Sequence, residues 1–540
     1  MSTFNRVVAA HETTSSLPAA VRARLATEMA DPTSDVGASL SGMFMSSVIL
    51  AGAGIDSTGT TDSTSALQSL ITANPGTTLF LPAGTYLTTG LTMAATDTAL
   101  LANPGSVTLR RTAGTNNLVN ITAARVSVRG LHLDGGGSAF PNSASVVRTN
   151  AVDTVIAECE VEGAAATATP DCVDSVEGAD RLVVRDSIFY GSVTVHNSDD
   201  SLITRNKFFA PGDPAAGYGV NVQSLFSGSH ANGTRITDNF FRITTNMFAI
   251  VPLSRNAGAL PPANTIISGN VFVAAGNCYG GISVDTSGKT TVSNNAFRVE
   301  SGVVSAGALE VVASSEVTAT GNVFDGGGTA DKVVIFNNSS DCVFVGNSVG
   351  NYNDAGTSWG VSLLLIVAPA AGQKSDRNVI AYNTFSLPAQ GHAVAISVNA
   401  ATASVSDNQI TGNTIYGTAS NTRGVKIDNA SNASCTGNII QDNSINVASY
   451  SVQLYQDTNT IIRGNIVPAT TIGPIYLSDT STLRVERNSW QFADAAPTTL
   501  QHTNGERVEN LTPTPGDPSG WVCTVAGTPG TWVPLASLPV

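Results

Sequence analysis

One short phrase recurs along most of the chain: an asparagine that follows a glycine, charged or polar residue and precedes an apolar segment. It occurs at Asn206, Asn239, Asn270, Asn295, Asn322, Asn347, Asn383, Asn413, Asn443, Asn465 and Asn488. Successive copies are mostly 19 to 36 residues apart, and segments around Leu131, Cys159 and Ser187 fit the same frame without the asparagine. Repeats of this length are typical of stacked structural units that cannot bury an apolar face alone.

Each repeat also contains a short segment in which apolar and polar residues alternate, as in GVNV from Gly219 and GISV from Gly281. Alternation with a period of two predicts a β-strand. The last inward apolar residue of the strand precedes the next asparagine by 11 residues in several repeats, for example Val195 and Asn206. The constant spacing predicts one rigid arc per repeat, with insertions at another corner.

These patterns predict an all-β chain folded as a right-handed parallel β-helix, in which short strands stack coil over coil at ~4.8 Å. Like residues then lie above one another, so the asparagines should form an internal ladder and also adopt the left-handed backbone of a sharp corner. A β-propeller has repeats of similar length, but its hairpins need Asn-Gly or Asp-Gly turns that these repeats lack. The β-helix is therefore favoured.

The composition agrees with stacking and excludes several classes of protein. Only 12% of residues are charged, with 26 Lys and Arg against 40 Asp and Glu, whereas ordinary soluble domains have ~25%. An apolar content of 42% excludes disorder for most of the chain, and the net charge of −14 argues against a nucleic-acid partner. The six cysteines are dispersed, and we expect them to be small buried hydrophobes.

The sequence divides into three parts, which we expect to be an N-terminal helical attachment segment (1–50), the β-helix (51–490) and a small C-terminal β unit (491–540). Residues 17–30 and 35–47 each place apolar residues on one helical face. At the other end, Trp521 and Trp532 are expected to form the core of a hairpin. His11 and Glu12 interrupt the first residues before any apolar run, and the longest apolar stretches are too short to span a bilayer. We expect a soluble protein made in the cytoplasm, without membrane insertion.

Residues 52–90 carry GAGIDSTGTTDSTSALQSLI followed by PGTTLFLPAGTYLTTG. This resembles the start of the pectate-lyase-like β-helix superfamily, where a turn rich in Gly and Asp precedes a short helix, a strand and a "lPaGtY" turn. The family's Asp-Gly-x-x-Asp-Asp is replaced here by a segment running from Asp56 to Asp62. The segments DPTSDVGASLSGMF (31–44) and GWVCTVAGTPGTW (520–532) resemble those of tail proteins from phages of actinobacteria.

The resemblance to tailspikes and minor tail proteins implies a homotrimer in the virion tail. It would be attached to tail or baseplate proteins by its N-terminus and would bind a host surface polysaccharide. Three functions stay open at this point: a tailspike that binds and cleaves that polysaccharide, a tail fibre that only binds it, and a bacterial pectate-lyase-like enzyme. The apparent lack of a signal peptide weighs against the third. If the chain is an enzyme, a glycoside hydrolase is favoured over a lyase.

Two groups of acidic residues are candidates for catalysis. Asp285 and Glu310 are predicted on adjacent coils, two residues apart along the strand, with Cα atoms ~8 Å apart. Paired carboxylates at such a separation suit a glycosidase, and two solvated acids on a polar sheet are the alternative. The second group is Asp171, Asp174 and Glu177, with His196 one coil further on, which loosely resembles the Asp-rich strand of polygalacturonase-like enzymes.

The second group lacks some companions of the enzymes it resembles. We expect no arginine on the coils beside it, which weakens a lyase, because a lyase needs a strong base and neutralisation of charge. GHA at His392 and RGVK at Arg423 are incomplete versions of the Gly-His-Gly and Arg-x-Lys motifs, and lie ~35 Å away. Stacked acids could instead bind Ca²⁺. No other cofactor or metal is expected.

A column of planar side chains precedes the alternating strands, and we expect several of them to bind sugar: Tyr218, Trp359, His392 and Arg423. Aromatic rings and a guanidinium beside polar neighbours offer flat apolar surfaces with hydrogen-bonding tips. Packing into the corner is the alternative for Trp359, and it is favoured for Tyr450 in the same column.

Overall fold

The computed structural model describes most of the chain from Ser47 onward. The described residues are 47–49 and 54–539, without 113–116, 137–144, 164–170, 210–218, 226–227, 245–246, 255–258, 303, 327–331, 351–361, 388–390, 399, 401, 430–433, 456–458, 468–472, 478–482, 487, 489–491, 494, 499–503, 511 and 528. The helices predicted at 17–30 and 35–47 lie outside them, apart from Ser47.

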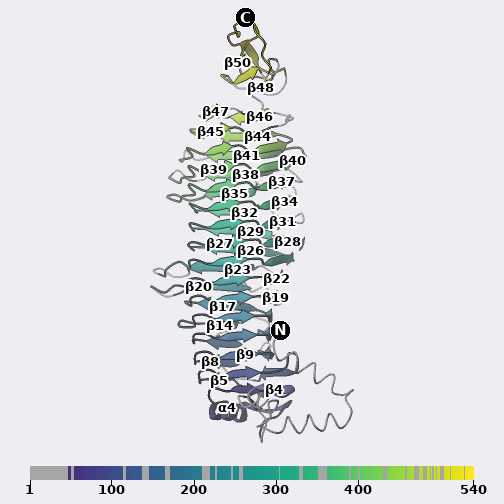
Figure 1. Cartoon of the computed structure of the whole chain (residues 1–540), viewed down its shortest axis with the longest axis vertical. Coiled ribbons are helices and arrows are strands. Elements are labelled where there is room, and N and C mark those ends of the chain that lie inside the picture. The colour runs from purple at the N-terminus through teal and green to yellow at the C-terminus, as the bar shows by residue number, and fades with distance from the viewer. Residues whose placement is uncertain are drawn as a thin grey trace, which may run out of the picture.

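The chain winds into a right-handed parallel β-helix, as the sequence predicted. Three parallel sheets, here called A, B and C, run along the whole stack (Figure 1). Each turn adds one strand to A, the next to B and the next to C, and each strand pairs with its counterpart one turn earlier and one turn later. Among the described residues, the sheets contain 17, 15 and 15 strands.

The strands of the three sheets are as follows. Sheet A consists of β1 (Ser47–Ile49), β3 (Thr78–Phe80), β6 (Ala99–Leu101), β9 (Ser127–Arg129), β12 (Val155–Ala157), β15 (Val183–Arg185), β18 (Leu202–Thr204), β21 (Arg235–Thr237), β24 (Ile266–Ser268), β27 (Thr291–Ser293), β30 (Thr318–Thr320), β33 (Val343–Val345), β36 (Val379–Ala381), β39 (Gln409–Thr411), β42 (Ile439–Gln441), β45 (Thr460–Arg463) and β47 (Leu483–Glu486). Sheet B consists of β2 (Thr58–Asp62), β4 (Gly84–Thr88), β7 (Val107–Arg111), β10 (His132–Asp134), β13 (Glu160–Glu162), β16 (Ile188–Tyr190), β19 (Lys207–Phe209), β22 (Phe240–Ile243), β25 (Val271–Ala275), β28 (Ala296–Ser301), β31 (Val323–Asp325), β34 (Ser348–Gly350), β37 (Thr384–Leu387), β40 (Thr414–Gly417) and β43 (Ser444–Val447). Sheet C consists of β5 (Leu91–Met93), β8 (Val119–Ile121), β11 (Val147–Thr149), β14 (Asp171–Ser175), β17 (Ser192–His196), β20 (Val220–Ser224), β23 (Phe248–Ser254), β26 (Cys278–Asp285), β29 (Val304–Val312), β32 (Lys332–Asn337), β35 (Ser362–Ala368), β38 (Gly391–Val398), β41 (Thr422–Asn429), β44 (Tyr450–Tyr455) and β46 (Gly473–Leu477).

The repeated asparagines form a buried ladder at the corner between sheets A and B. Asn322 shows the pattern: its Nδ2 donates to the Val292 carbonyl and to Asn347 Oδ1, both at 2.9 Å. Its own Oδ1 accepts from the backbone N–H and from Nδ2 of Asn295. The same relay joins the other asparagines of the repeat in turn. The predicted ladder is confirmed, and it satisfies polar groups that no water can reach.

From Asn206 to Asn465, the left-handed backbone at this corner belongs to the residue before the ladder asparagine. The prediction that the asparagine itself adopts this backbone was wrong. The φ angles are 57° at Asp238, 68° at Gly269 and 64° at Gly321. Glycine, aspartate and asparagine adopt this conformation at least cost, which explains the Gly or Asp that precedes most ladder positions. The asparagine then points inward and joins the ladder.

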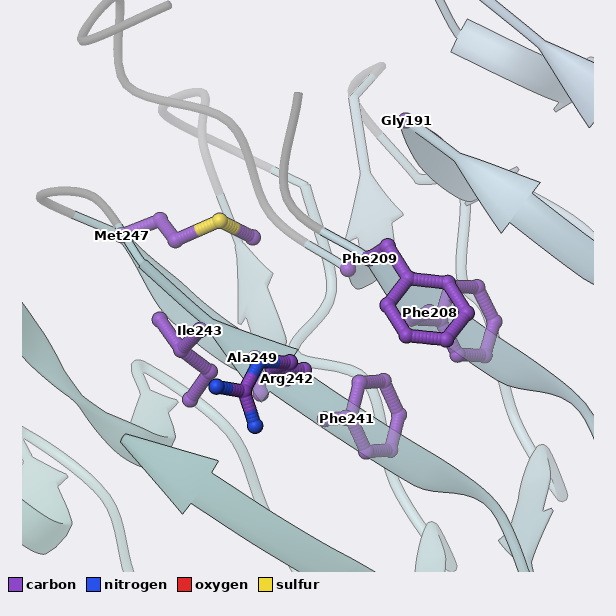
Figure 2. Close-up of a pocket in the computed structure, with 9 residues that line it drawn as sticks. Gly191, Phe208, Phe209, Phe241, Arg242, Ile243, Met247 and Ala249 are labelled. Carbon is purple, nitrogen blue, oxygen red and sulfur yellow. The ribbon is translucent and has the colours of Figure 1, made fainter. Parts of the chain in front are cut away.

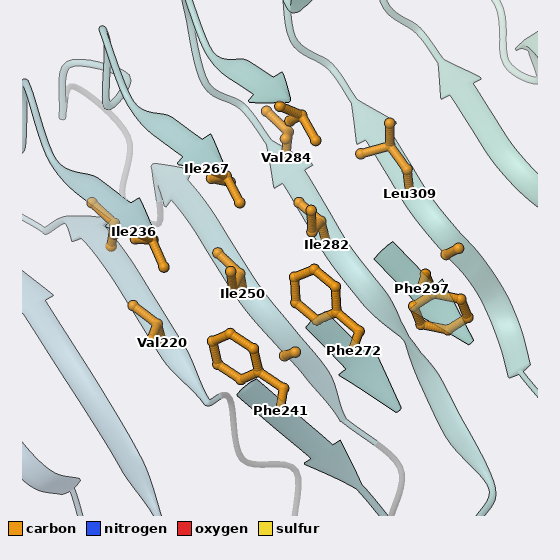
Figure 3. Close-up of a cluster of buried hydrophobic side chains, with 14 of the residues drawn as sticks. Val220, Ile236, Phe241, Ile250, Ile267, Phe272, Ile282, Val284, Phe297 and Leu309 are labelled. Carbon is orange, nitrogen blue, oxygen red and sulfur yellow. The ribbon is translucent and has the colours of Figure 1, made fainter. Parts of the chain in front are cut away.

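The interior is filled by like side chains stacked on successive turns (Figure 3). Phe208, Phe241, Phe272 and Phe297 come from consecutive strands of sheet B, with ring centroids 4.7, 5.1 and 6.4 Å apart. The first two separations are close to the ~4.8 Å strand spacing, so each ring packs against the next as the coils stack. All six cysteines are free and buried, as predicted.

The described residues of the motif at 52–90 form the N-terminal end of the β-helix. The helix α4 (Thr64–Ala73) lies at the N-terminal end of the stack (Figure 1). Its Leu67 and Ile71 are buried in the core. Tyr86 of the PAGTY turn is buried, and its hydroxyl donates to the Pro82 carbonyl at 2.7 Å. Among the described residues, no helix has the length and apolar character that crossing a membrane requires.

The C-terminal unit is a small four-stranded sheet of β48 (Phe492–Ala493), β49 (Arg507–Asn510), β50 (Gly520–Val525) and β51 (Thr531–Pro534). Trp521 and Trp532 lie in register with the buried Val508 and Cys523, respectively. The tryptophans themselves are only half-buried. A single layer of short strands does not fully enclose two indole rings, so the tryptophans flank the small core that they were predicted to form.

Candidate functional site

A bulge in β14 brings two aspartates together on sheet C. β14 and β17 pair in register, except that Cys172 is an extra residue without a partner in β17. Asp171 therefore lies opposite Ser192, and Asp174 opposite Thr194. In a regular strand Asp171 and Asp174 would point to opposite faces, because they are three residues apart. The extra residue Cys172 lies between them, so both side chains lie on the same face. Bulges are common beside active sites, where they re-aim a side chain.

The Asp171 carboxylate lies in a half-buried position lined by hydroxyl groups. Its Oδ1 accepts hydrogen bonds from Ser192 at 2.7 Å and from Thr194 at 2.5 Å. Burial, followed by the negative charge of Asp174, raises the pKa of Asp171 above its usual value, although the two hydrogen bonds oppose the shift. A carboxyl group with a raised pKa keeps its proton to higher pH and can donate it.

Asp174 is the centre of a charged cluster next to Asp171. Its Oδ1 lies 3.0 Å from His196 Nδ1, and its Oδ2 lies 3.8 Å from Arg148 Nε. The Ser145 hydroxyl donates to the same Oδ2 at 3.4 Å. The other ring nitrogen of His196 lies 3.1 Å from Gln223 Oε1, so both nitrogens face oxygen atoms. The histidine and the arginine hold the Asp174 carboxylate in place from two neighbouring strands.

The two carboxyl groups thus occupy different environments at close range. Since Asp171 and Asp174 oppose residues two apart on β17, their Cα atoms are ~6.6–6.8 Å from each other. One carboxyl group is half-buried with a raised pKa, and the other lies beside a guanidinium. A pair whose surroundings differ in this way can divide the roles of general acid and of base or nucleophile.

The structure places three of the four residues of this predicted group close together, and their catalytic role stays a prediction. The structure brings Asp171, Asp174 and His196 together, but Glu177 lies outside the cluster. β14 ends at Ser175, and Glu177 falls in the exposed turn that follows. Glu177 was expected beside Asp171 and Asp174, and it lies apart from them because β14 ends two residues before it.

The expectation that no arginine lies beside this group was wrong. Arg148 in β11 is directly opposite Asp174 in β14. The turn that contains β11 lacks the repeated asparagine, so its strand could not be aligned with the others from that phrase. The alternation of buried Val147, outward Arg148 and buried Thr149 is the signal that would have placed it.

Asp285 and Glu310 lie as the sequence predicted, on the adjacent strands β26 and β29. Asp285 is opposite Val312, and Glu310 is opposite Ser283, which is the expected offset of two residues. Both acids are partly exposed, and Asp285 Oδ1 accepts a hydrogen bond from the Thr286 hydroxyl at 2.9 Å. Their strands are four and five steps along sheet C from β14, ~19–24 Å away, so they form a separate candidate. Their catalytic role stays a prediction.

Two of the residues expected to bind sugar lie side by side near the C-terminal end of sheet C. His392 in β38 is opposite Arg423 in β41. These strands are eight and nine steps from β14, ~38–43 Å, so they belong to a different site from Asp171, as expected. Tyr218 and Trp359 lie outside the described residues, and their role stays a prediction.

The described residues bring one set of potential metal ligands together, on sheet B and away from the predicted acids. His132, Glu160 and Glu162 place one ligand atom each within 4.8 Å of the others. His132 Nε2 lies 3.4 Å from Glu162 Oε1, so direct contact between these two side chains accounts for part of this arrangement. A calcium site among Asp171, Asp174 and Glu177 stays a prediction.

A small pocket lies at the corner between sheets B and C, where Phe208, Phe241, Met247 and Ala249 line it (Figure 2). Its free volume is about 10 Å³, which is room for one water molecule at most. Its lining is largely apolar and includes no acid. This pocket is a gap in the packing, and the outer face of sheet C is the better candidate for chemistry.

Comparison with protein families matches the model of the right-handed β-helix region to residues 262–429. This match covers the middle of the stack and agrees with the parallel sheets described above. The chain is thus a right-handed parallel β-helix protein. Comparison with curated proteins finds no match.

Solved structures with a similar fold include enzymes and phage proteins. Tailspike protein 3 of bacteriophage CBA120 matches with a TM-score of 0.49 and 13% identity over 97% of this chain and 77% of that one. The Dettilon tailspike protein matches with a TM-score of 0.44 and 18% identity over 76% and 74%. The A-module of mannuronan C-5 epimerase AlgE6 from Azotobacter vinelandii matches with a TM-score of 0.43 and 15% identity over 82% and 99%. These similarities concern the fold.

Proposed function

We propose that this chain is a tailspike-type protein of a phage tail that binds a host surface polysaccharide and cleaves its glycosidic bonds at Asp171 and Asp174. The observation that carries the proposal is the bulge at Cys172, which turns both carboxyl groups toward the same part of sheet C. The resemblance of residues 31–44 and 520–532 to phage tail proteins supports the virion location.

The arrangement suits acid-catalysed hydrolysis of a glycosidic bond. Asp171, with its raised pKa, donates a proton to the oxygen of the leaving sugar as the bond to the anomeric carbon breaks. Asp174 either takes a proton from the attacking water or attacks the anomeric carbon itself. Arg148 and His196 fix its position, and the Ser192 and Thr194 hydroxyls orient Asp171.

Arg148 also makes a lyase the second candidate. A lyase removes a proton beside the carboxylate of an acidic sugar and expels the glycosidic oxygen, which leaves a carbon–carbon double bond. That reaction needs a cation to offset the charge of the sugar, and Arg148 is the cation beside Asp174. Incubation with host-envelope polysaccharide separates the outcomes: hydrolysis releases reducing ends only, whereas elimination also produces ultraviolet absorbance from the double bond. A fibre that only binds gives neither product.

The pH dependence of cleavage should follow the protonation of Asp171. Because its pKa is raised and it must donate a proton, we expect activity to fall as the pH rises through that pKa. Asp174 contributes to the shift, so Asp174→Asn should lower the pKa of Asp171. NMR titration of the labelled carboxyl carbon measures this in both proteins. An unchanged pKa in Asp174→Asn would contradict the coupling between the two groups.

The tailspike assignment also entails a trimer, as the family resemblance implies. Mass measurement in solution should give about 166 kDa, three times the 55.2 kDa of one chain. We further propose that residues 1–50 attach the trimer to the tail or baseplate. A chain without residues 1–50 should then keep its cleavage activity and fail to join the tail. A protein of 55.2 kDa at micromolar concentration would contradict the tailspike assignment.

A further inference from the structure

A histidine and two glutamates meet on the outer face of sheet B, near the N-terminal end of the stack. His132 in β10 lies opposite Glu160 in β13, and Glu162 follows two residues later. The middle residue of each strand, Leu133 or Val161, is fully buried, so the three side chains point outward. One ligand atom of each side chain lies within 4.8 Å of the others. We call this group the His–Glu–Glu cluster.

The spacing of the cluster suits a tetrahedral metal ion. His132 Nε2 lies 3.4 Å from Glu162 Oε1, which is longer than the ~2.7–3.2 Å of a hydrogen bond. This nitrogen makes no hydrogen bond within the described part of the chain. Zinc binds nitrogen and oxygen ligands at ~2.0–2.2 Å, so two ligand atoms of one tetrahedral ion are ~3.3–3.5 Å apart. The distance between Nε2 and Oε1 therefore matches one edge of such a site.

The two glutamates lack the cation that a neighbouring acid has. Asp134, also in β10, pairs with Arg110 at 2.6 Å. In the part of the chain that the structure describes, no lysine or arginine forms an ion pair with Glu160 or Glu162, and only His132 contacts the Glu162 carboxylate. Two adjacent carboxylates repel one another, and a divalent cation between them offsets both charges.

Neighbouring hydroxyl groups face the outer sides of the ligands. The Thr108 hydroxyl lies 3.4 Å from His132 Nδ1, which leaves Nε2 as the nitrogen that faces the carboxylates. The Tyr190 hydroxyl donates a hydrogen bond to Glu160. Burial, followed by the charges of Glu160 and Glu162, raises the pKa of Tyr190, so its phenol keeps the proton that it donates. Metal-binding histidines and carboxylates commonly have partners of this kind.

An ion can reach the cluster from solvent on the outer face of the sheet. The Glu162 side chain is 42% exposed and lies directly beside Nε2, so its movement opens the way to the nitrogen. Glu160 is also partly exposed, and its side chain can turn toward the ion. Three protein ligands leave one position of a tetrahedral ion for water.

We propose that His132, Glu160 and Glu162 bind one Zn²⁺ ion per chain, with water as the fourth ligand. The ion would link β10 to β13 and so join two consecutive turns of the β-helix. This site is on a different sheet from Asp171 and Asp174, and the proposal does not depend on the proposed cleavage. An ion that binds only the folded chain also stabilises it.

The test is a calorimetric titration of Zn²⁺ into the full-length chain after removal of metal with EDTA. We expect one ion per chain and a higher midpoint of thermal unfolding with zinc than without it. His132→Gln and Glu162→Gln should each weaken zinc binding at least tenfold, and circular dichroism checks that both variants fold. Co²⁺ in place of Zn²⁺ should give visible absorption bands that His132→Gln abolishes. A wild-type chain that takes up no zinc, or unchanged binding in both variants, would overturn the proposal.

Two matched controls show whether the ion binds at this cluster. His230→Gln removes an exposed histidine that lies 2.9 Å from Asp199, and it should leave zinc binding unchanged. Asp171→Asn with Asp174→Asn should also leave it unchanged. An equal loss in either control would place the ion elsewhere and overturn the site. Ca²⁺ that displaces Zn²⁺ at equal concentration would show that the acids alone attract cations, which also overturns it. Zinc binding by a chain that cleaves no polysaccharide would support this site and contradict only the proposed cleavage.

Discussion

Replacing Asp171 by asparagine should reduce polysaccharide cleavage by a factor of ~10²–10⁴, the usual contribution of a general acid. Asparagine keeps an acceptor oxygen for Ser192 and Thr194 but has no proton to donate at that position. Release of reducing ends from host-envelope polysaccharide measures the loss. Asp174→Asn should show a loss of similar size, because it removes the base or nucleophile.

The Asp171→Asn variant should fold at least as stably as the wild-type chain at a pH above the pKa of Asp171. A carboxyl group with a raised pKa in the folded state stabilises that state below its unfolded pKa and loses this contribution as the pH rises through the folded pKa. Asparagine does not ionise, so the variant has no such loss. A matched control, Asp238→Asn, alters an aspartate at the corner between sheets A and B and should keep full activity.

The two candidate pairs of acids can be told apart directly. Asp285→Asn and Glu310→Gln should leave cleavage within about twofold of wild type if Asp171 and Asp174 carry it. Full cleavage activity in Asp171→Asn, together with loss of cleavage in Asp285→Asn, would show that the catalytic site lies at Asp285 and Glu310, in the middle of sheet C. Both outcomes use the same assay and the same substrate.

Replacing Asn322 by alanine should lower the free energy of unfolding by about 3–5 kcal/mol, because several buried polar groups lose their partners. The backbone N–H and Nδ2 of Asn295 would have no acceptor, and the Val292 carbonyl would lose a donor. Equilibrium unfolding in urea measures the change. Asn322 is 1% exposed, so bulk solvent does not supply these bonds in the wild-type chain.

The control for the ladder is Gln409→Ala, which removes an exposed amide from the outer side of β39. Its free energy of unfolding should change by less than about 0.5 kcal/mol, as is usual for surface substitutions. If Asn322→Ala lowers the free energy of unfolding by no more than Gln409→Ala does, the ladder asparagines fill space and their hydrogen bonds do not stabilise the fold.

The features of the fold that repeat were predictable from the sequence. Stacked coils place like residues over one another, so the repeated asparagines mark one corner of each turn between Asn206 and Asn488. Asp285 and Glu310 were placed correctly for the same reason, since their strands β26 and β29 alternate regularly. Periodicity predicts position wherever the period is unbroken.

The features of the candidate site that depend on irregularity were not predictable. The bulge at Cys172 inserts one residue into β14, and nothing in DCVDS shows which residue is extra until the strand is paired with β17. Arg148 was missed because its turn lacks the repeated asparagine. Glu177 was misplaced because alternation alone does not show that β14 ends at Ser175. The proposed site therefore lies where the repeat is locally broken, which agrees with a functional cause for the break.

The most direct test is a structure of the Asp171→Asn protein with a bound oligosaccharide from the polysaccharide that the wild-type chain cleaves. We expect a sugar on sheet C with its glycosidic oxygen within hydrogen-bond reach, ~2.6–3.2 Å, of the side chain at position 171, and with Asp174 beside the anomeric carbon. An oligosaccharide bound only at Asp285 and Glu310, or on sheet A or B, would contradict it.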